Sequence, residues 1–597
     1  MRIAALVKQI PKFEAMELGS DGRLVREGLE LEMNAYCRRA VSKGVELAKA
    51  TGGTCTVITL GPPSAVDALR EAIAWGADDG VLITDPAFAG SDTLATARAL
   101  AAALDREGPF DLILTGRNSV DADTGQVGPE IAELLDLPFA TGVKQLDLGE
   151  GVVSVLCEED DGQSERIVRL PAVLSAAERL CEPCKVDPPG RLAVDAGLIR
   201  TASAADLDSF SNGRARWGQD GSGTYVGEVR VLEVTRQRNV LSGPLDEQVD
   251  QAVRLLTTMG ALDPSGDASR VVPAVPPSRG AGGPAVAVVV EADRANVTRE
   301  LLGAAAALAR EIDGHVVAIT TEAVSELGSW GADAIVVIDG AEAEEDVAGA
   351  VATWAAGAKP WAILLPSTAW GREVGGRAAA RLDAGLTGDA IDLEVSRVAS
   401  TGEAQLLAWK PAFGGRLVAA IYCSSPIQMA TVRAGVLPTP SPREVDSAAA
   451  TSTLTVAPLG RVRVMVSVRD DDLEELATAN AVIGVGAGVP PEEYGAIEPL
   501  LLALDAELAA TRKVTDKGWQ PRARQVGITG RSIAPRLYVA IGLSGKYNHM
   551  VGVRAAGTIL AINPDPEALV WDHADVGIVG DWREVLPLLV ARLERGA

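Results

Sequence analysis

The chain has 597 residues, too many for one hydrophobic core, and at about 100–200 residues per domain it predicts three to five domains. Its net charge of −26 and its aromatic content of only 4% disfavour phosphate-backbone and base-stacking surfaces, so we expect no nucleic-acid partner. No apolar run has the length of a membrane span, and six scattered cysteines form no disulfide framework. We therefore expect a cytoplasmic α/β protein without direct membrane insertion.

Short β-rich runs alternate with helical segments from the start of the chain. Strand-like runs lie at 3–7, 56–60, 81–84 and 112–115, and helical spacing is found at 37–49, 65–75, 93–104 and 130–135. Strands that alternate with helices predict a mainly parallel sheet that is covered on both faces.

This pattern then repeats along the chain. Trp75-Gly76-Ala77-Asp78 precedes one strand-like run, and Trp330-Gly331-Ala332-Asp333 precedes another. In each copy a later apolar strand is followed by a Val-Gly step into a helix, at Val127-Gly128 and at Val374-Gly375. An offset of roughly 250 residues indicates duplicated domains rather than a solenoid.

Two breaks divide the chain. Residues 263–284 are rich in Pro, Ser and Gly and read as a linker, and residues 438–442 precede a final α/β unit. The fold class is thus α/β, with three doubly wound parallel-sheet domains, two of them a duplicated pair. The predicted domains are 1–262, whose part from about 190 is a less regular extension, then 285–440 and 460–597.

The last unit carries strand-end loops suited to a nucleotide. The strand at 537–542 leads to Ser544-Gly545, and the strand at 558–562 ends in Asn563. Doubly wound sheets bind ligands at the carboxyl ends of their strands, where free amides meet phosphates. We therefore expect Ser544-Gly545 to cradle a pyrophosphate and Asn563 to reach a ribose or adenine. Ordinary tight turns are the alternative.

Ordered motifs in this unit resemble the FAD domain of the electron-transfer flavoprotein α subunit. They are Gln525-Val526-Gly527 with Thr529-Gly530, the run 535–545 with His549, Ala561-Ile562-Asn563 with Asp565-Pro566, and Ala574-Asp575 with Gly577-Ile578-Val579 and Asp581. Residues 285–440 resemble the N-terminal domain of the same subunit, through 410–415 and 430–433. Residues 1–262 resemble the β subunit, through Val7-Lys8, 34–37, 76–78 and 121–129. The resemblance thus covers nearly the whole chain, in β–α fusion order.

The resemblance implies an FAD-binding C-terminal domain and an adenine-nucleotide site in the first domain. FAD would be lined by Gly486, Ala487, Thr511, Arg512, Gln525, Val526, Gly527, Ile528, Thr529, Ser544, Gly545, Lys546, Tyr547, Asn548, His549, Asn563, Asp581 and Trp582. AMP would be lined by Leu6, Asn34, Ala35, Tyr36, Cys37, Leu60, Asp121, Asp123, Thr124, Gln126, Val127 and Gly128. Thr529 would bond near flavin N5, and His549 would sit by the pyrimidine carbonyl. No metal and no catalytic residue is implied.

The sequence departs from the family pattern at three places. The flavin-loop arginine aligns with Ala487, and the glutamine before Thr529 is Ile528. The segment that usually docks dehydrogenases reads Cys181-Glu182-Pro183-Cys184-Lys185. We therefore expect a changed flavin potential and a dedicated partner. Cys181 and Cys184 fit a dithiol or half a zinc site, but no second pair completes a metal set, which favours a structural role.

The resemblance implies a redox carrier rather than a substrate-converting enzyme. It would accept electrons from a partner flavin dehydrogenase and pass them toward an electron-transfer flavoprotein quinone oxidoreductase or a similar acceptor. One alternative is an electron-bifurcating flavoprotein that uses NADH, with a second FAD in the β half. Another is a degenerate nucleotide-binding scaffold, for which Ala487 and Ile528 are the motive.

Overall fold

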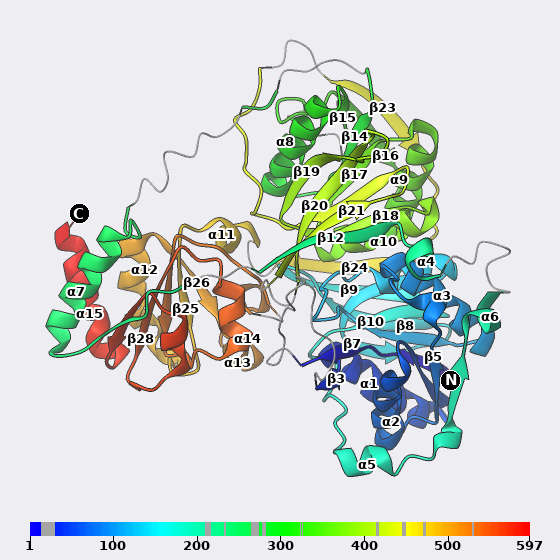
Figure 1. Cartoon of the computed structure of the whole chain (residues 1–597), viewed down its shortest axis with the longest axis horizontal. Helices are drawn as coiled ribbons and strands as arrows, with labels where there is room; N and C mark the ends of the chain where they lie inside the picture. Colours follow the sequence, from blue (N-terminus) through cyan, green and yellow to red (C-terminus); the bar gives the residue numbers. More distant parts are fainter. Residues whose placement is uncertain are drawn as a thin grey trace.

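The structure is a computed structural model that describes residues 1–12, 30–208, 217–231, 235–263, 274–276, 282–322, 324, 326–412, 417–444, 449–469, 473–527 and 530–596. Ile528, Thr529 and most of the predicted linker lie outside the described residues. Figure 1 shows three lobes: a first unit in blue and cyan, a second in green and yellow, and a third that ends in red.

The first unit is built on a ten-stranded sheet. Its order is β11 (Ile199–Ala202), β5 (Asp79–Ile83), β4 (Thr54–Leu60), β1 (Arg2–Leu6), β6 (Leu112–Gly116), β10 (Ala172–Ala176), β7 (Phe139–Leu148), β8 (Val152–Glu158), β9 (Gly162–Arg169) and β24 (Val462–Arg469). The strands from β11 to β7 run parallel, and those from β7 to β24 pair antiparallel. The remaining elements are β2 (Gln9–Pro11), β3 (Leu31–Met33), α5 (Pro188–Leu192) and α6 (Ala204–Leu207).

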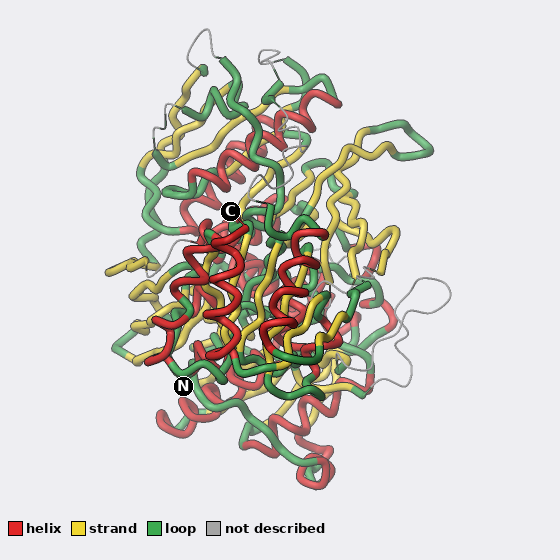
Figure 2. The backbone as a smooth tube through the Cα atoms, turned by 90° about the vertical axis from the view of Figure 1, so that its left-hand side faces the viewer, coloured by secondary structure: helices red, strands yellow, loops and turns green. Residues whose placement is uncertain are grey.

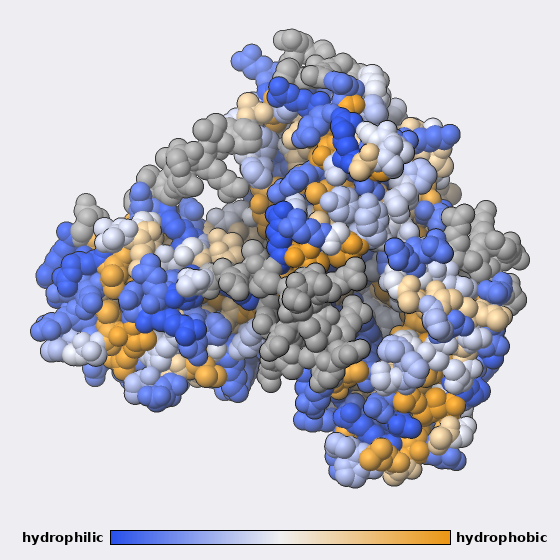
Figure 3. Space-filling view, viewed as in Figure 1, coloured by the Kyte–Doolittle hydropathy of each residue, from blue (hydrophilic) through white to orange (hydrophobic). Residues whose placement is uncertain are grey.

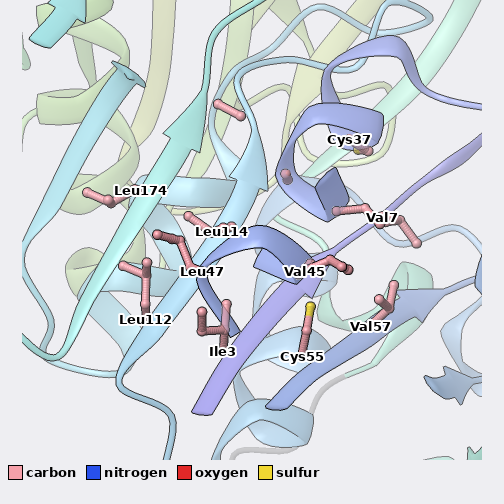
Figure 4. Close-up of a cluster of buried hydrophobic side chains, with 14 of the residues drawn as sticks. Ile3, Val7, Cys37, Val45, Leu47, Cys55, Val57, Leu112, Leu114 and Leu174 are labelled. Carbon is pink, nitrogen blue, oxygen red and sulfur yellow. The ribbon is translucent and has the colours of Figure 1, made fainter. Parts of the chain in front are cut away.

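Helices cover both faces of this sheet. α1 (Ala35–Thr51) and α2 (Val66–Trp75) bury one hydrophobic cluster, while α3 (Thr93–Glu107) and α4 (Val127–Leu134) bury another on the opposite face. Figure 4 shows the first cluster, in which side chains of α1 lie against Ile3 of β1, Cys55 of β4 and Leu114 of β6. On the face in Figure 3, hydrophobic surface gathers at the foot of this unit, over α2 and α5.

The second unit repeats this arrangement. Its seven-stranded parallel sheet has the order β18 (Gly385–Ala390), β22 (Gln428–Val432), β17 (Ala362–Pro366), β14 (Ala285–Val289), β15 (His315–Thr320), β16 (Ala334–Asp339) and β23 (Ala450–Thr455), with helices α8 (Ala295–Glu311), α9 (Glu344–Ala358) and α10 (Ala369–Leu382). Read from β23 to β18, the chain follows the same path as from β11 to β7. This shared strand order confirms the predicted duplication. An antiparallel sheet of β12 (Thr224–Val231), β21 (Leu417–Cys423), β20 (Ala404–Ala412) and β19 (Asp392–Arg397) lies beside it.

The third unit is a six-stranded parallel sheet. Its order is β13 (Asn239–Leu241), β29 (Val576–Val579), β28 (Thr558–Asn563), β27 (Leu537–Ile541), β25 (Ala481–Val485) and β26 (Ala506–Ala510). Its helices are α7 (Leu245–Thr258), α11 (Leu473–Thr478), α12 (Glu498–Leu504), α13 (Arg512–Asp516), α14 (Tyr547–Met550) and α15 (Trp582–Gly596). Figure 2 shows helices side by side in front of these strands, and α7 packs on α15.

Three strands lie outside the sheet that their place in the chain predicts. β24, from the predicted 460–597 domain, completes the sheet of the first unit by pairing with β9. β12 and β13, both from the predicted 1–262 domain, pair with β21 of the second unit and β29 of the third. An edge strand has unpaired backbone groups, and these crossing segments supply partners for them. Across the described ranges, no helix combines the length and apolarity needed to cross a membrane.

Candidate functional site

A cavity of about 450 Å³ opens at the carboxyl ends of β1, β4 and β6. The first unit lines it with Leu6, Val7, Lys8, Asn34, Cys37, Leu60, Ser91, Asp92, Thr93, Thr96, Leu100, Thr115, Gly116, Arg117, Asn118, Ser119, Ala122, Thr124, Gly125, Gln126, Val127 and Gly128. Thr224 and Val226 of β12 and Leu386, Thr387, Gly388, Lys410 and Ile421 of the second unit close the other side. The volume lies within the range of small-molecule sites, about 300–1,000 Å³.

A buried asparagine holds the loop that borders this cavity. Asn34, directly before α1, donates from Nδ2 to the carbonyl of Asn118 at 2.8 Å and accepts from the amide of Val120 at 3.2 Å. Asn118 in turn donates to Asp123, whose backbone has a positive φ of 48°. These bonds fix the path of residues 117–126 between β6 and α4.

Polar atoms in the cavity wall are left without protein partners. Gln126 and Glu130 are fully buried, and the Thr93 hydroxyl lies 3.1 Å from Gln126 Oε1 and 3.0 Å from Glu130 Oε1. Among the described residues, Gln126 Nε2, Glu130 Oε2 and Thr115 Oγ1 have no hydrogen-bond partner. Gln126 and Thr115 line the cavity, whereas Glu130 does not. Because buried polar groups are nearly always paired, the unpartnered atoms of Gln126 and Thr115 fit a polar ligand in the cavity.

The second unit contributes a cation to the wall. Lys410 is buried and donates to the carbonyl of Pro411 at 3.4 Å. Burial lowers the pKa of its ammonium group, while Asp389 and Asp123 act in the opposite direction. A cation at this place suits an anionic group such as a phosphate.

A second cavity of about 190 Å³ lies where the three units meet. Five arginines line it: Arg117 from the first unit, Arg372 and Arg433 from the second, and Arg522 and Arg531 from the third. Carboxylates interleave with them; Arg433, for example, pairs with Asp389. Arg117 and Asn118 also line the first cavity, so the two cavities adjoin.

The structure brings together most residues predicted for the adenine nucleotide. Leu6, Asn34, Cys37, Leu60, Thr124, Gln126, Val127 and Gly128 line the first cavity, and Tyr36 and Asp123 line the second. Ala35 and Asp121 line neither of these cavities. Asp121 instead pairs with Lys8 at 2.8 Å, and this pairing holds the pKa of its carboxyl below the ordinary value although burial acts to raise it.

Part of the cavity wall is formed by residues that were not predicted from the sequence. Residues 121–128 are predicted through the family resemblance, whereas Thr115, Arg117 and Asn118 surround the end of β6, where the strand-end rule could have found them. Lys410 and Gly388 come from the other unit, and no local signal connects them to this cavity.

The residues predicted for FAD gather at one edge of the third sheet. Gly486–Ala487 follows β25, Thr511–Arg512 follows β26, Ser544–Asn548 follows β27, Asn563 ends β28 and Asp581–Trp582 follows β29. Within the described part of the chain, the backbone amides of Ser544, Gly545 and Lys546 donate no hydrogen bond, and Lys546 has no ion-pair partner. Unbonded amides beside a cation fit a phosphate group.

Close packing explains two glycines of these loops. Gly545 has a positive φ of 74°, and a Cβ there would lie 2.1 Å from the amide nitrogen of Val570. At Gly486 a Cβ would lie 2.2 Å from the carbonyl oxygen of Gly542. Glycine therefore lets the strand-end loops approach one another closely.

His549 is held by the protein through both ring nitrogens. Nδ1 lies 3.0 Å from the carbonyl of Val526 and must donate to it, so Nε2 accepts from the Tyr538 hydroxyl at 2.7 Å. Burial lowers the pKa of the imidazole to about 4 and keeps it neutral. The predicted contact with a pyrimidine carbonyl would require the ring to give up one of these partners.

Other predicted FAD residues make contacts within the protein. Arg512 forms an ion pair at 2.8 Å with Glu178 of the first unit. Asn563 donates to the carbonyl of Leu543 at 3.0 Å, and Trp582 donates to the carbonyl of Gly488 at 3.3 Å. Arg512 thereby joins the third unit to the first, while Asn563 and Trp582 hold the strand-end loops.

Neither thiol of the Cys181–Cys184 segment is set up for chemistry. Cys184 is buried, and its backbone bonds to Arg38 of α1, while Cys181 Sγ lies 3.4 Å from the carbonyl of Arg39. Burial raises the pKa of Cys184 to about 12 and that of Cys181 to about 11. In the part of the chain that the structure describes, no group of three His, Cys, Asp or Glu residues is placed to hold a metal ion.

The fold and these strand-end loops define a class: multi-domain α/β proteins with a cavity or open loops at the carboxyl ends of parallel strands. The electron transfer flavoprotein domain model matches residues 21–207 and 286–459, and the electron transfer flavoprotein FAD-binding domain model matches residues 475–554. The chain belongs to the electron transfer flavoprotein family.

Relatives match the two halves separately. The chain is 34% identical over 260 residues to the electron transfer flavoprotein subunit beta of Thermoanaerobacterium thermosaccharolyticum, covering 43% of this chain and 98% of that protein. It is 33% identical over 314 residues to the subunit alpha of the same organism, covering 50% of this chain and 94% of that protein. It is also 35% identical over 329 residues to protein FixB of Bradyrhizobium diazoefficiens, covering 51% and 87%. This chain therefore joins β-like and α-like parts in one polypeptide.

Proposed function

We propose that this chain is a single-chain electron carrier with one FAD in the third unit and AMP in the cavity of the first unit. It accepts electrons from a partner flavin dehydrogenase and passes them toward a quinone oxidoreductase. The observation that carries the FAD site is the group of unbonded amides at Ser544–Lys546, within the region matched by the FAD-binding model. When bound, FAD supplies the redox chemistry, and the chain's residues bind and orient it. We place the carrier in the cytoplasm.

The AMP site is supported by three features of the first cavity. The amino end of α4 points into it, Gln126 and Thr115 present unpartnered polar atoms, and Lys410 supplies a positive charge. Together these match a ligand with polar ring atoms and a phosphate.

The experiment is an absorbance spectrum of the purified chain, with the released nucleotides identified and counted by mass spectrometry. We expect a yellow protein from which acid releases one FAD and one AMP. A protein that stays colourless after incubation with FAD would support the degenerate scaffold instead.

One observation favours a second candidate function. Because the two cavities adjoin at Arg117 and Asn118, a ligand longer than AMP could extend from the first cavity into the arginine-lined one. A second FAD there would suit a bifurcating flavoprotein that uses NADH. Two FAD per chain, together with reduction by NADH, would support this alternative over AMP.

Partner choice is part of the proposal. Residues 180–186 replace the run that commonly docks dehydrogenases in this family, and the segment is fixed on α1 by the Cys184–Arg38 bonds. Since specificity depends on contacts that fit one partner and clash with others, we expect a dedicated donor. Reduction by a standard acyl-CoA dehydrogenase at the rate of other family members would contradict this.

A further inference from the structure

Thr93 and Gln126 line the first cavity and Glu130 does not, but the Thr93 hydroxyl contacts both of the other side chains; Gln126 and Glu130 are buried. The Thr93 hydroxyl lies 3.0 Å from Glu130 Oε1 and 3.1 Å from Gln126 Oε1. A hydroxyl has one proton, so Thr93 cannot fully donate to both oxygens. One of the other two groups must therefore donate to Thr93.

A neutral Glu130 resolves this arrangement. Its carboxyl proton is donated to Thr93, and Thr93 then donates to Gln126 Oε1, which leaves Gln126 Nε2 as the unpartnered donor that the structure shows. We propose that Glu130 is a positioning residue which, as a neutral acid, acts through Thr93 to turn the Gln126 amide so that its NH₂ group faces the nucleotide. The ligand class is a nucleotide that presents an acceptor atom to this NH₂ group. The inference rests on the proposed nucleotide site.

The surroundings of Glu130 keep it neutral near pH 7. Burial, followed by the charge of Asp92 at the start of α3, raises the pKa of the Glu130 carboxyl to about 8, although the hydrogen bond with Thr93 and then the charge of Arg98 act to lower it. Arg377 and Arg381 of α10 also approach α4, but both form their ion pairs with Glu133, one turn further along the helix.

The relay predicts a pH-dependent affinity. Above pH 8 the Thr93 hydroxyl donates its hydrogen bond to the Glu130 carboxylate. Towards Gln126, Thr93 can then only accept a hydrogen bond. The amide then turns, and its oxygen faces the acceptor atom of the ligand. The AMP phosphate has a second pKa of about 6, so its charge is constant over this range. Lys410 is the competing cause, because its deprotonation would also weaken anion binding as the pH rises.

The test is calorimetric titration of AMP into the nucleotide-depleted full-length protein between pH 7 and pH 9.5. We expect the wild-type affinity to fall about tenfold as the pH rises through 8, the scale of one lost hydrogen bond to a buried group. Glu130→Gln, which can donate to Thr93 at every pH, should bind as tightly as wild type at pH 7 and lose the pH dependence. Glu133→Gln, one turn along α4, should keep the wild-type profile.

The Thr93 variants give an independent measurement if Glu130→Gln does not fold. Thr93→Val should weaken binding at all pH values with a flat profile, and Thr93→Ser should restore both affinity and profile. A Glu130→Gln protein that still loses affinity above pH 8 would assign the effect to Lys410 and overturn the inference, as would a flat wild-type profile. A wild-type protein that binds no adenine nucleotide at any pH would overturn the nucleotide site itself.

Discussion

The first and second units share one strand path but differ at the loop where the first unit has its cavity. In the first unit, residues 117–126 separate β6 from α4, and this loop borders the cavity. In the second unit, only Ser367 and Thr368 separate β17 from α10. The longer loop thus forms part of the wall of the first cavity, while Ser367 and Thr368 border the smaller second cavity.

The two helix starts differ in the same sense. In α10 the Thr368 hydroxyl accepts from the amide of Gly371 at 3.0 Å, so the protein satisfies its own helix end. In α4 the Gln126 side chain makes no such bond, and the helix start lines the cavity. Free amides at a helix start attract anions, which suits the nucleotide proposed there.

The equivalent helices α4 and α10 also pack on each other, so the second unit becomes a wall of the first unit's site. Removing the buried charge in this contact should have the largest effect. Arg377 is fully buried and contacts Glu373 at 3.2 Å and Glu133 at 3.4 Å. Arg377→Ala leaves buried carboxylates without their cationic partner. We therefore expect the free energy of unfolding, measured by urea titration, to fall by about 3–5 kcal/mol.

The matched control is Arg381→Ala. Arg381 also pairs with Glu133, at 2.6 Å, but its side chain is 41% exposed. An exposed ion pair contributes about 1 kcal/mol or less. Equal losses in the two variants would show that burial does not set the strength of this contact between the copies.

The third sheet extends the comparison, because one of its strand-end residues is a buried neutral histidine. His549 has a folded-state pKa of about 4 against an ordinary value of 6.5, so the unfolded chain binds more protons between these values. The contribution of the neutral His549 to the free energy of unfolding is complete above pH 6.5 and is lost as the pH falls toward 4. Between pH 7.5 and pH 4.5, we expect the free energy of unfolding of wild type to fall by about 2–3 kcal/mol more than that of His549→Gln.

Urea unfolding at the two pH values measures this difference. His315→Gln, at the start of β15 in the second unit, serves as the control for replacing a histidine elsewhere in the chain. A His549→Gln protein that loses as much stability as wild type would mean that the imidazole is protonated in the folded chain.

A larger side chain at Gly388 of the second unit should fill part of the first unit's cavity and exclude the nucleotide. A Cβ at Gly388 would lie 2.9 Å from Gln126 Nε2 and 3.2 Å from Thr124. Gly388→Leu should therefore exclude AMP, with about a hundredfold loss of affinity, since a clash removes several contacts together. Gly357→Ala is the control, because a Cβ at Gly357 meets nothing within 4 Å. Counting nucleotides released from each variant should show FAD retained and AMP lost only in Gly388→Leu.

Signals in neighbouring residues predicted most of the strands and helices, but only part of the wall of the first cavity. The predicted strand at 3–7 corresponds to β1, and the predicted helix at 93–104 is the larger part of α3. Both were predictable because strand and helix periodicity depend on residues that are close together in the chain. The family resemblance, carried by the motif at 121–129, located Thr124 and residues 126–128 of the cavity wall.

The remaining features depend on contacts between distant segments. The side chains of β24 are mostly exposed, and the strand pairs with β9 through its backbone. The sequence of β24 therefore does not indicate which strand it pairs with. Lys410 reaches the cavity only because the two copies pack together. The bond of His549 to Tyr538 depends on how a helix start sits on a strand of the third sheet.

The smallest expected effect tests the helix starts directly. Thr368→Ala removes the cap of α10, in which the hydroxyl accepts from Gly371 and donates to Glu291 at 2.6 Å. Loss of a cap costs about 1 kcal/mol, so we expect a decrease of this size in urea unfolding, and Thr368→Ser should restore it. Gln126→Ala removes no side-chain cap from α4 but removes an unpartnered donor from the cavity wall, so it should weaken AMP binding. A Thr368→Ala protein as stable as wild type would mean that the hydroxyl does not stabilise the start of α10, and the contrast between the two copies would then rest on loop length alone.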